Sequence, residues 1–342
     1  MKKYLYIAIA AATLASCSQD EVMDVVEKEA IAFSEGFINN STRAVDPSKT
    51  NSNLTQFNVW GTVKGSTNST VAIFANDNVE GGKVGDNSIW SCTTKTQYWI
   101  GGATYNFAAL VNAGDAKNVG LTNGLPTSVT YTYNKDNELD LLYARSEENI
   151  KGNASGNGPV AFTFDHMLSK VGFKVNNQNS GNTGYSYKVK DIKITSALKT
   201  KATVTIGQTE SKDNTYTWDS YAGTDLTNLD FGAAVAQNAS AVTDAISIGD
   251  GVTAYSNIEH LLIPNTYATL GVSFTLETYV TDTNGTVQHV NTETINKSAT
   301  NVTFAPETYY LINIGLKVGK VIDFSVTSLK EWGEADSSVT VQ

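Results

Sequence analysis

Residues 272–290 hold the pattern that decides the fold class: a strand, a turn and a second strand. The first strand reads Val272-Ser-Phe-Thr-Leu-Glu-Thr-Tyr-Val280, the turn reads Thr281-Asp-Thr-Asn-Gly-Thr286, and the second strand opens with Val287-Gln-His-Val290. Runs of valine, threonine, tyrosine and phenylalanine favour β-strands. An Asn-Gly pair between two such runs favours a tight hairpin, because both residues tolerate a positive φ. We therefore expect antiparallel β-structure here.

The same organisation extends over most of the chain. From Leu54 onward, short strand-like runs alternate with turn signals, and no long segment keeps the spacing of a helix. Residues 309–318 alternate again, and the residues on one face are Tyr310, Ile312, Ile314, Leu316 and Val318. The stretch Lys151-Gly-Asn-Ala-Ser-Gly-Asn-Gly-Pro159 has no apolar periodicity and predicts a boundary. Two blocks of short strands predict an all-β protein with two β-sandwiches.

The composition is typical of an exported, β-rich protein. The chain has 342 residues, enough for two domains, and 41% of them are hydrophobic, which is enough for packed cores. With 34 acidic against 24 basic residues, the formal net charge is −10, which speaks against nucleic acid or anionic lipid surfaces as partners. Only two cysteines are present, so we expect no disulfide framework.

The N-terminus predicts export. Lysines at positions 2 and 3 precede an apolar run over residues 4–12, and the leader closes on Leu14-Ala-Ser-Cys17. This is typical of a secretory signal, and the apolar run is shorter than the roughly 20 residues of a membrane span. The last four residues resemble a bacterial lipobox, in which Cys17 is acylated and becomes the new N-terminus. The alternative is an ordinary cleaved signal with an incidental cysteine.

One isolated strand follows the leader. Within residues 30–37, the side chains of Ile31, Phe33 and Phe37 lie on one face of an extended chain. A single strand is not stable alone, so it must pair with a segment later in the sequence. The polar loop behind it contains one basic residue, Arg43, where a protease can reach the chain.

No motif in the sequence carries catalysis. The three histidines, His166, His260 and His289, are far apart and have no carboxylate, cysteine or second histidine at metal-ligand spacing. There is no nucleophile elbow, phosphate loop or zinc pattern, and residues 282–285 lack most ligands of a calcium loop. We therefore expect that the protein is not an enzyme and has neither a cofactor nor a metal site.

The tryptophans allow a different hypothesis. Trp60, Trp90 and Trp99 would offer a sugar-stacking platform if their rings were exposed, as in a surface glycan-binding lipoprotein. Each lies beside apolar strand residues, and sandwich cores need large side chains between their sheets. Core packing is the preferred interpretation, and the platform is the alternative.

Several segments, taken in order, resemble the fimbrillin family of Bacteroides and Porphyromonas, the lipoprotein-derived pilins of type V. The resemblance runs over nearly the whole chain, and no single motif carries it. The segments are Ile31-Ala-Phe33 with Thr42-Arg43-Ala44, Tyr98-Trp99 with Tyr105-Asn-Phe107, Glu138-Leu-Asp-Leu-Leu-Tyr143, Phe162-Thr-Phe-Asp-His-Met-Leu-Ser-Lys170, Leu262-Ile-Pro264, and Pro306-Glu-Thr-Tyr-Tyr-Leu-Ile-Asn-Ile314.

This resemblance implies two tandem transthyretin-like, Greek-key β-sandwich domains and a processing route. The precursor is exported as a lipoprotein, exposed on the outer membrane through lipid on Cys17, and cut between Arg43 and Ala44 by a trypsin-like, arginine-specific protease. The cut removes the strand with Ile31, Phe33 and Phe37. The subunit then accepts a strand from a neighbour, polymerises with other pilin subunits into a fimbrium and supports adhesion. A tip or anchor subunit of the same system is the alternative.

The C-terminal tail is the candidate donor of that strand. Its alternating apolar residues are Ile322, Phe324, Val326, Val339 and Val341. Alternatively, residues 321–329 form the last strand of the second domain. The expected division is a signal peptide at 1–17, a pro-segment at 18–43, an N-terminal domain at 44–158, a C-terminal domain at 159–320 and a tail at 321–342.

Overall fold

The all-β prediction is confirmed by the computed structural model of the chain. The structure describes residues 29–34, 37–38, 54–66, 69–81, 90–153, 155–179, 181, 183–236, 244–318 and 323–329. Apart from a short 3-10 helix, Ala116–Asn118, the regular elements of these residues are β-strands. They form four hydrogen-bonded sheets, numbered 1 to 4 below.

Sheets 1 and 2 build one end and the middle of the molecule. Sheet 1 has eight strands in the order β1-β10-β8-β5-β2-β3-β4, with β9 paired to β5, and sheet 2 has four in the order β14-β13-β7-β6. The strands of sheet 1 are β1 (Phe37–Ile38), β2 (Gln56–Lys64), β3 (Thr70–Gly81), β4 (Trp90–Cys92), β5 (Thr104–Val111), β8 (Leu142–Arg145), β9 (Ile150–Lys151) and β10 (Thr163–His166). Those of sheet 2 are β6 (Val119–Thr122), β7 (Leu125–Thr132), β13 (Lys201–Gln208) and β14 (Asn214–Ala222).

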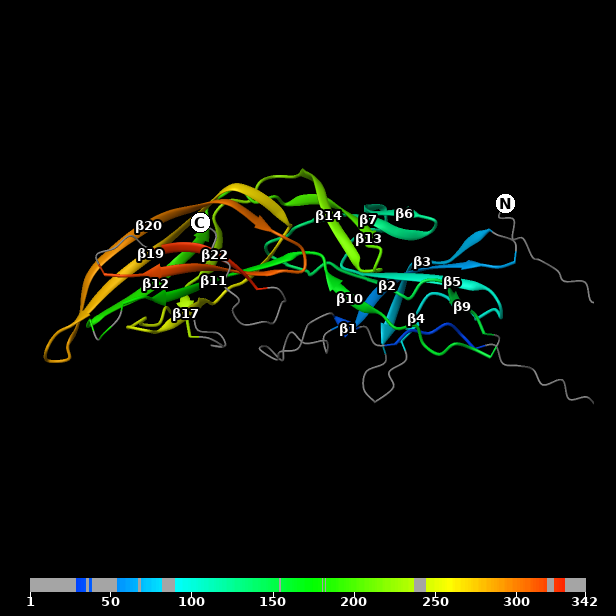
Figure 1. Cartoon of the computed structure of the whole chain (residues 1–342), viewed down its shortest axis with the longest axis horizontal. Helices are drawn as coiled ribbons and strands as arrows, with labels where there is room; N and C mark the ends of the chain where they lie inside the picture. Colours follow the sequence, from blue (N-terminus) through cyan, green and yellow to red (C-terminus); the bar gives the residue numbers. More distant parts are fainter. Residues whose placement is uncertain are drawn as a thin grey trace, which may run out of the picture.

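Sheets 3 and 4 build the other end of the elongated molecule (Figure 1). Sheet 3 runs in the order β16-β17-β11-β21-β22, with β18 paired to β11, and sheet 4 in the order β15-β12-β19-β20. The strands of sheet 3 are β11 (Ser169–Asn177), β16 (Ala234–Val235), β17 (Thr253–Ser256), β18 (His260–Leu262), β21 (Tyr309–Leu316) and β22 (Asp323–Leu329). Those of sheet 4 are β12 (Tyr185–Ile194), β15 (Leu229–Gly232), β19 (Asn265–Thr281) and β20 (Val287–Phe304).

Three hydrophobic cores hold these sheets. The N-terminal core lies on one face of sheet 1, the middle core between sheets 1 and 2, and the C-terminal core between sheets 3 and 4. Strand β5 contributes alternate residues to two of these cores. Phe107 and Ala109 face the N-terminal core, while Ala108 and Leu110 face the middle core. This is the two-residue alternation of a strand that is buried on both faces.

The predicted hairpin is confirmed. Strands β19 and β20 pair antiparallel, and residues 282–286 connect them, with Gly285 at φ +80°. The predicted alternation after residue 309 is also found, because Ile312 and Ile314 are fully buried, although Val318 lies beyond the strand and is exposed.

The sheets are not purely antiparallel. β11 and β21 pair in parallel, as do β1 and β10. Sheets 1 and 2 also contain strands from both sides of residue 158, since β10, β13 and β14 follow it in sequence. The hairpin of β13 and β14 packs on β7 and closes the middle core. The domain limits expected from the sequence therefore stay a prediction.

Candidate functional site

The strand predicted to be removable lies between two segments that are far apart in the sequence. Phe33 bridges to Trp90 on one side, antiparallel, and to Val160 on the other, parallel. The Phe33 N–H donates to the Trp90 carbonyl at 2.8 Å, the Trp90 N–H returns a bond of 2.8 Å, and the Ser34 N–H donates to the Val160 carbonyl at 2.9 Å. Trp90 opens β4, at one end of sheet 1, while Val160 precedes β10, near the other end. This segment therefore joins the two edges of the sheet.

The same segment fills the N-terminal core. Ile31 is 4% exposed and Phe33 is fully buried. The ring of Phe33 lies within 6.0 Å, centroid to centroid, of four other phenylalanine rings, those of Phe57, Phe74, Phe107 and Phe162. Ring separations and mostly edge-to-face angles of this kind are the favourable geometry for aromatic clusters. Without this segment, the core would have an open aromatic pocket.

The segment continues into β1. Phe37 pairs with Thr163 and Ile38 with Phe164, both in parallel register on β10. The side chain of Phe37 lies outside the described residues, as do Cys17, Arg43 and Ala44. Their predicted roles in lipidation and cleavage stay predictions.

The first part of the predicted donor tail forms β22 in its own sheet. It pairs antiparallel with β21, and Val326 is 6% exposed in the C-terminal core. Phe324 packs partly buried on the same core. The side-chain amide of Asn313 donates to Thr327 Oγ1 at 2.6 Å and adds a polar contact to the pairing. In this structure the segment is the last strand of sheet 3, while Ile322, Val339 and Val341 lie outside the described residues.

The three tryptophans of the alternative hypothesis are core residues. Trp60 is 2% exposed in the middle core, and Trp90 and Trp99 are 4% and 1% exposed in the N-terminal core. None of the three rings has a free face on which a sugar could stack, so the core interpretation is confirmed.

A polar cluster that was not predicted from the sequence lies where the two ends of the molecule meet. Glu138, in the loop before β8, bonds His260 Nδ1 at 2.5 Å and accepts the Leu261 N–H at 3.0 Å. It also accepts the hydroxyl of Tyr133. His260 Nε2 faces the Asp230 carbonyl at 2.7 Å. Both ring nitrogens of His260 therefore face acceptors, so the ring makes both bonds only as the charged imidazolium.

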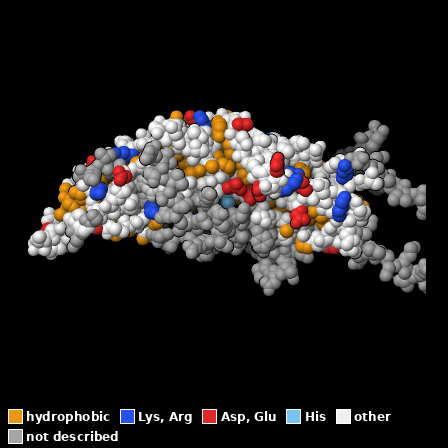
Figure 2. Space-filling model, viewed as in Figure 1, with side chains coloured by type: hydrophobic (Ala, Val, Ile, Leu, Met, Phe, Trp, Pro, Cys, Tyr) orange, Lys and Arg blue, Asp and Glu red, His pale blue; other side chains and the backbone are white. Residues whose placement is uncertain are grey.

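The charge state of this pair follows from its contacts. Burial opposes the charge on His260, but its bonds to Glu138 and to the Asp230 carbonyl outweigh that effect and raise the pKa of the imidazole. Burial likewise opposes the charge of Glu138, but the bonds from His260, Tyr133 and Leu261 lower the pKa of its carboxyl. Figure 2 shows a histidine beside a group of acidic side chains midway along the molecule.

A second histidine–carboxylate pair comes from the same loop. Asp140 Oδ2 lies 2.5 Å from Nδ1 of His166 in β10. The sequence analysis treated both histidines as isolated, and spacing could not have found their partners, because Glu138 and His260 are 122 residues apart.

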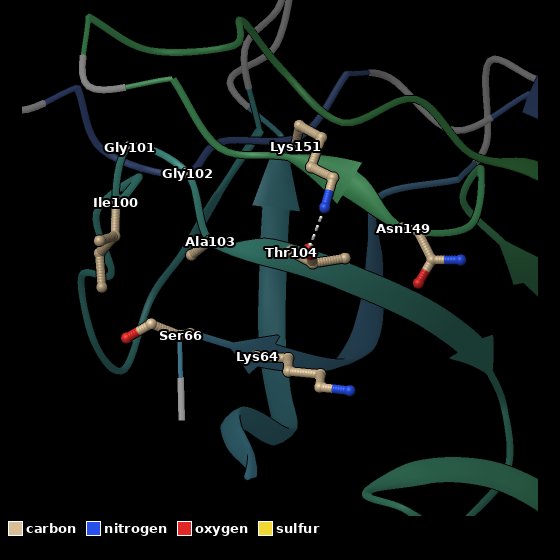
Figure 3. A pocket seen from close by; sticks show the side chains of 10 residues that line it. Lys64, Ser66, Ile100, Gly101, Gly102, Ala103, Thr104, Asn149 and Lys151 are labelled. Atoms are coloured by element: carbon tan, nitrogen blue, oxygen red, sulfur yellow. Dashed lines mark hydrogen bonds between the residues drawn. The ribbon is translucent and has the colours of Figure 1, made fainter. Parts of the chain in front are cut away.

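The described part of the chain offers neither a metal site nor a membrane-spanning helix. No group of three or more histidine, cysteine or acidic residues could hold a metal ion there. No helix within the same residues is long and apolar enough to cross a membrane. A depression is lined by Lys64, Thr104 and Lys151, among other residues (Figure 3). The strands β5 and β9, which contribute to it, lie near one end of the molecule (Figure 1).

One solved structure has a similar architecture. A fimbrial protein from Bacteroides vulgatus has a similar structure, with a TM-score of 0.59 and 16% sequence identity over 88% of this chain and 99% of that one. A fimbrial assembly protein from Parabacteroides distasonis covers 88% of this chain and 96% of its own, with a TM-score of 0.45 and 14% identity. No curated protein sequence matched. The profile of the fimbrillin-like family matches residues 42–332, most of the chain, and the protein therefore belongs to the fimbrillin-like family.

Proposed function

We propose that this protein is the precursor of a structural fimbrial subunit, displayed on the cell surface, that polymerises by strand exchange. One observation carries the proposal: residues 29–34 join both edges of sheet 1 and fill the N-terminal core, yet they precede the residues matched by the family profile. A segment of this kind can leave without breaking the chain that builds the sheet. Membership of the fimbrillin-like family supports assembly with other pilin subunits and a structural rather than a catalytic role.

Removal of the segment makes the capture of another strand energetically favourable. Burying Ile31 and Phe33 stabilises the protein by about 1.5–3 kcal/mol for each side chain. After removal, the N–H and C=O of Trp90 and the carbonyl of Val160 lose the partners that the segment supplies. Unpaired backbone groups beside an open apolar pocket favour the capture of another extended strand. The incoming strand needs alternating apolar side chains at the positions of Ile31 and Phe33.

Processing would proceed in the order that the sequence predicts. Lipid on Cys17 anchors the precursor to the outer membrane, and an arginine-specific protease cuts between Arg43 and Ala44. Everything before residue 44, including the strand at 29–34, then leaves with the lipid. A stalk subunit would accept and donate a strand, whereas a tip subunit would accept only and an anchor would keep its lipid.

The tail can donate in two ways. Either β22 detaches from β21 and enters the neighbour, or β22 stays in sheet 3 and the residues beyond it, with Val339 and Val341, enter the groove. The first route must break the contacts of Val326 with the C-terminal core, whereas the second leaves that core intact. The second route is the one we propose.

Treatment of the purified precursor with an arginine-specific protease tests the first step. Cleavage after Arg43 should yield a form that begins at Ala44 and assembles into fibres seen by electron microscopy, while the untreated precursor stays monomeric. The Arg43→Ala variant should stay monomeric under the same treatment. Lys49→Ala, a matched loss of a basic residue in the same part of the sequence, should still assemble. Fibres from Arg43→Ala, or a mature N-terminus elsewhere on the cell surface, would contradict the proposed processing.

A further inference from the structure

The depression at the end of sheet 1 has a basic and polar lining. Its walls are residues 64–66 at the end of β2, residues 100–104 leading into β5, and Asn149 and Lys151 around β9. Its volume is about 690 Å³. Figure 3 shows Lys151 reaching to Thr104 from one side, with Lys64 on the other side of Thr104 and Asn149 and Ser66 farther out in the same view.

Strand register explains why these side chains gather. Lys64 of β2 pairs with Thr104 of β5, and Thr104 pairs with Lys151 of β9, both in antiparallel register. Directly opposed residues of antiparallel strands point to the same face. The two lysines therefore flank one threonine in a row across three strands, and adjacent strands lie about 4.8 Å apart.

Among the described residues, neither lysine of this row forms an ion pair. Lys151 Nζ is held by the hydroxyl of Thr104 at 2.8 Å, not by a carboxylate. None of the described residues that line the depression is acidic. Elsewhere many lysines pair with carboxylates, such as Lys95 with Asp77 and Lys199 with Asp225. In a chain of net charge −10, two lysines in one depression form a local positive site.

The wall opposite the lysines is held by hydrogen bonds. The Ile100 N–H donates to the hydroxyl of Tyr105 at 2.8 Å. The Gly102 N–H donates to the Gly152 carbonyl at 2.9 Å, and the Gly152 N–H donates to the Ala103 carbonyl at 2.8 Å. The loop therefore keeps the side chain of Ile100, which is 59% exposed, at the rim.

We propose that this depression binds an acidic saccharide. The carboxylate or sulfate group would lie between Lys64 and Lys151, over the hydroxyl of Thr104, where it receives charge-assisted hydrogen bonds. Ser66 and Asn149 offer hydroxyl and amide groups for the sugar hydroxyls, and the exposed Ile100 offers an apolar surface to the ring carbons. The site is independent of strand exchange and lies on different residues from the buried tryptophans.

Calorimetry with a heparin-derived tetrasaccharide tests the proposal on the purified, uncut precursor. The wild-type protein should bind it, and binding should weaken as salt rises, because both partners are charged. The double variant Lys64→Gln and Lys151→Gln should bind at least about tenfold more weakly, since two charge-assisted bonds are lost. Lys317→Gln, an exposed lysine at the other end of the molecule, is the matched control and should bind as the wild type. A neutral dextran tetrasaccharide should not bind.

Three outcomes would overturn the proposal. They are equal binding by the double variant, absence of binding by a wild-type protein whose circular dichroism shows the folded β-structure, and equal affinity for the dextran. Inorganic sulfate at the same concentration serves as a competitor. If sulfate alone displaced the saccharide at equal concentration, the site would be a simple anion site and the saccharide part would be wrong.

Discussion

The two segments at the edges of sheets 1 and 3 contribute to their cores in different ways. Residues 29–34 have hydrogen-bonded neighbours on both sides, Trp90 and Val160, and place a fully buried phenylalanine among four aromatic rings. β22 is the last strand of sheet 3, is paired to β21 among the described residues, and contributes a buried Val326 and a partly buried Phe324 to the core.

This difference separates the roles that we propose for the two ends of the chain. A segment bonded on both sides leaves two unpaired edges and a deep pocket when it is removed, so its loss prepares a site for a replacement strand. An edge strand bonded on one side covers a core more weakly. We therefore propose that the first region is the acceptor and that the residues beyond the second are the donor.

The largest expected effect concerns the donor. Deleting residues 321–342 should leave a subunit that is cut normally after Arg43 but forms no fibres, because it has no strand to pass on. Deleting residues 330–342 alone should have the same effect if β22 stays in sheet 3. Electron microscopy and size-exclusion chromatography of the protease-treated proteins decide between these cases.

The two deletions also separate the routes of donation. Fibres from the shorter deletion but not from the longer one would show that β22 itself is exchanged. Fibres formed equally well by both deleted forms would remove the tail from the mechanism and leave β22 as an ordinary domain strand.

The next prediction compares how much one side chain stabilises the N-terminal core and the C-terminal core. Phe33→Ala should lower the free energy of unfolding of the uncut precursor by about 3–5 kcal/mol, because it empties an aromatic pocket. Val326→Ala should lower it by about 2 kcal/mol, since fewer methyl groups are lost. Val287→Ala, at a side chain that is 60% exposed, is the control. We expect it to change stability by less than about 0.5 kcal/mol.

Urea unfolding of the three variants measures this difference. A smaller loss for Phe33→Ala than for Val326→Ala would reverse the comparison between the two edges. It would also remove the energetic argument that the N-terminal groove drives assembly.

The third effect concerns the contact between the two ends of the molecule, the pair of Glu138 and His260. Hydrogen bonds to charged groups of this kind contribute about 1.5–3 kcal/mol to stability. Because the pKa of His260 is raised in the folded protein, its charged form contributes fully to stability below about pH 6.5, the usual pKa of the group. This contribution is lost as the pH rises through the folded-state pKa. Because the pKa of Glu138 is lowered in the folded protein, its carboxylate contributes fully to stability above about pH 4.5. This contribution is lost as the pH falls through the folded-state pKa. The pair therefore stabilises most between these two values.

Urea unfolding of wild type and His260→Gln at pH 5.5 and pH 8.5 checks this prediction. The stability difference between the two proteins should be larger at pH 5.5. Glu307 titrates in the same range, because burial and Asp165 raise the pKa of its carboxyl to about 7, so the comparison is made against the variant at each pH. His289→Gln, at an exposed histidine in β20, is the matched control for the loss of an imidazole. An equal difference at both pH values would contradict the charged pair.

Local periodicity made much of the fold predictable. The alternation around Phe33 and Ile312, and the Asn284-Gly285 turn, depend on residues that are close in sequence, and each is read from a few neighbours. The burial of Ile31 and Phe33 was predictable for the same reason. Residues outside the described part, Cys17 and Arg43 among them, keep their roles as predictions.

Which strands and side chains lie next to one another was not predictable in the same way. The bridging of Phe33 to Trp90 and Val160, the parallel pairing of β11 with β21, and the contact of Glu138 with His260 join residues far apart in the chain. Alternation specifies which face of a strand is buried, but not which strand lies beside it.

By itself, the sequence determined an all-β protein of the fimbrillin-like family, with an apolar N-terminal strand that must be paired. Only the tertiary structure decided that this strand joins both edges of one sheet, and that β2, β5 and β9 place Lys64, Thr104 and Lys151 in one row. The physical reason is that side-chain direction follows from the local backbone, whereas strand neighbours are selected by the packing of the whole chain.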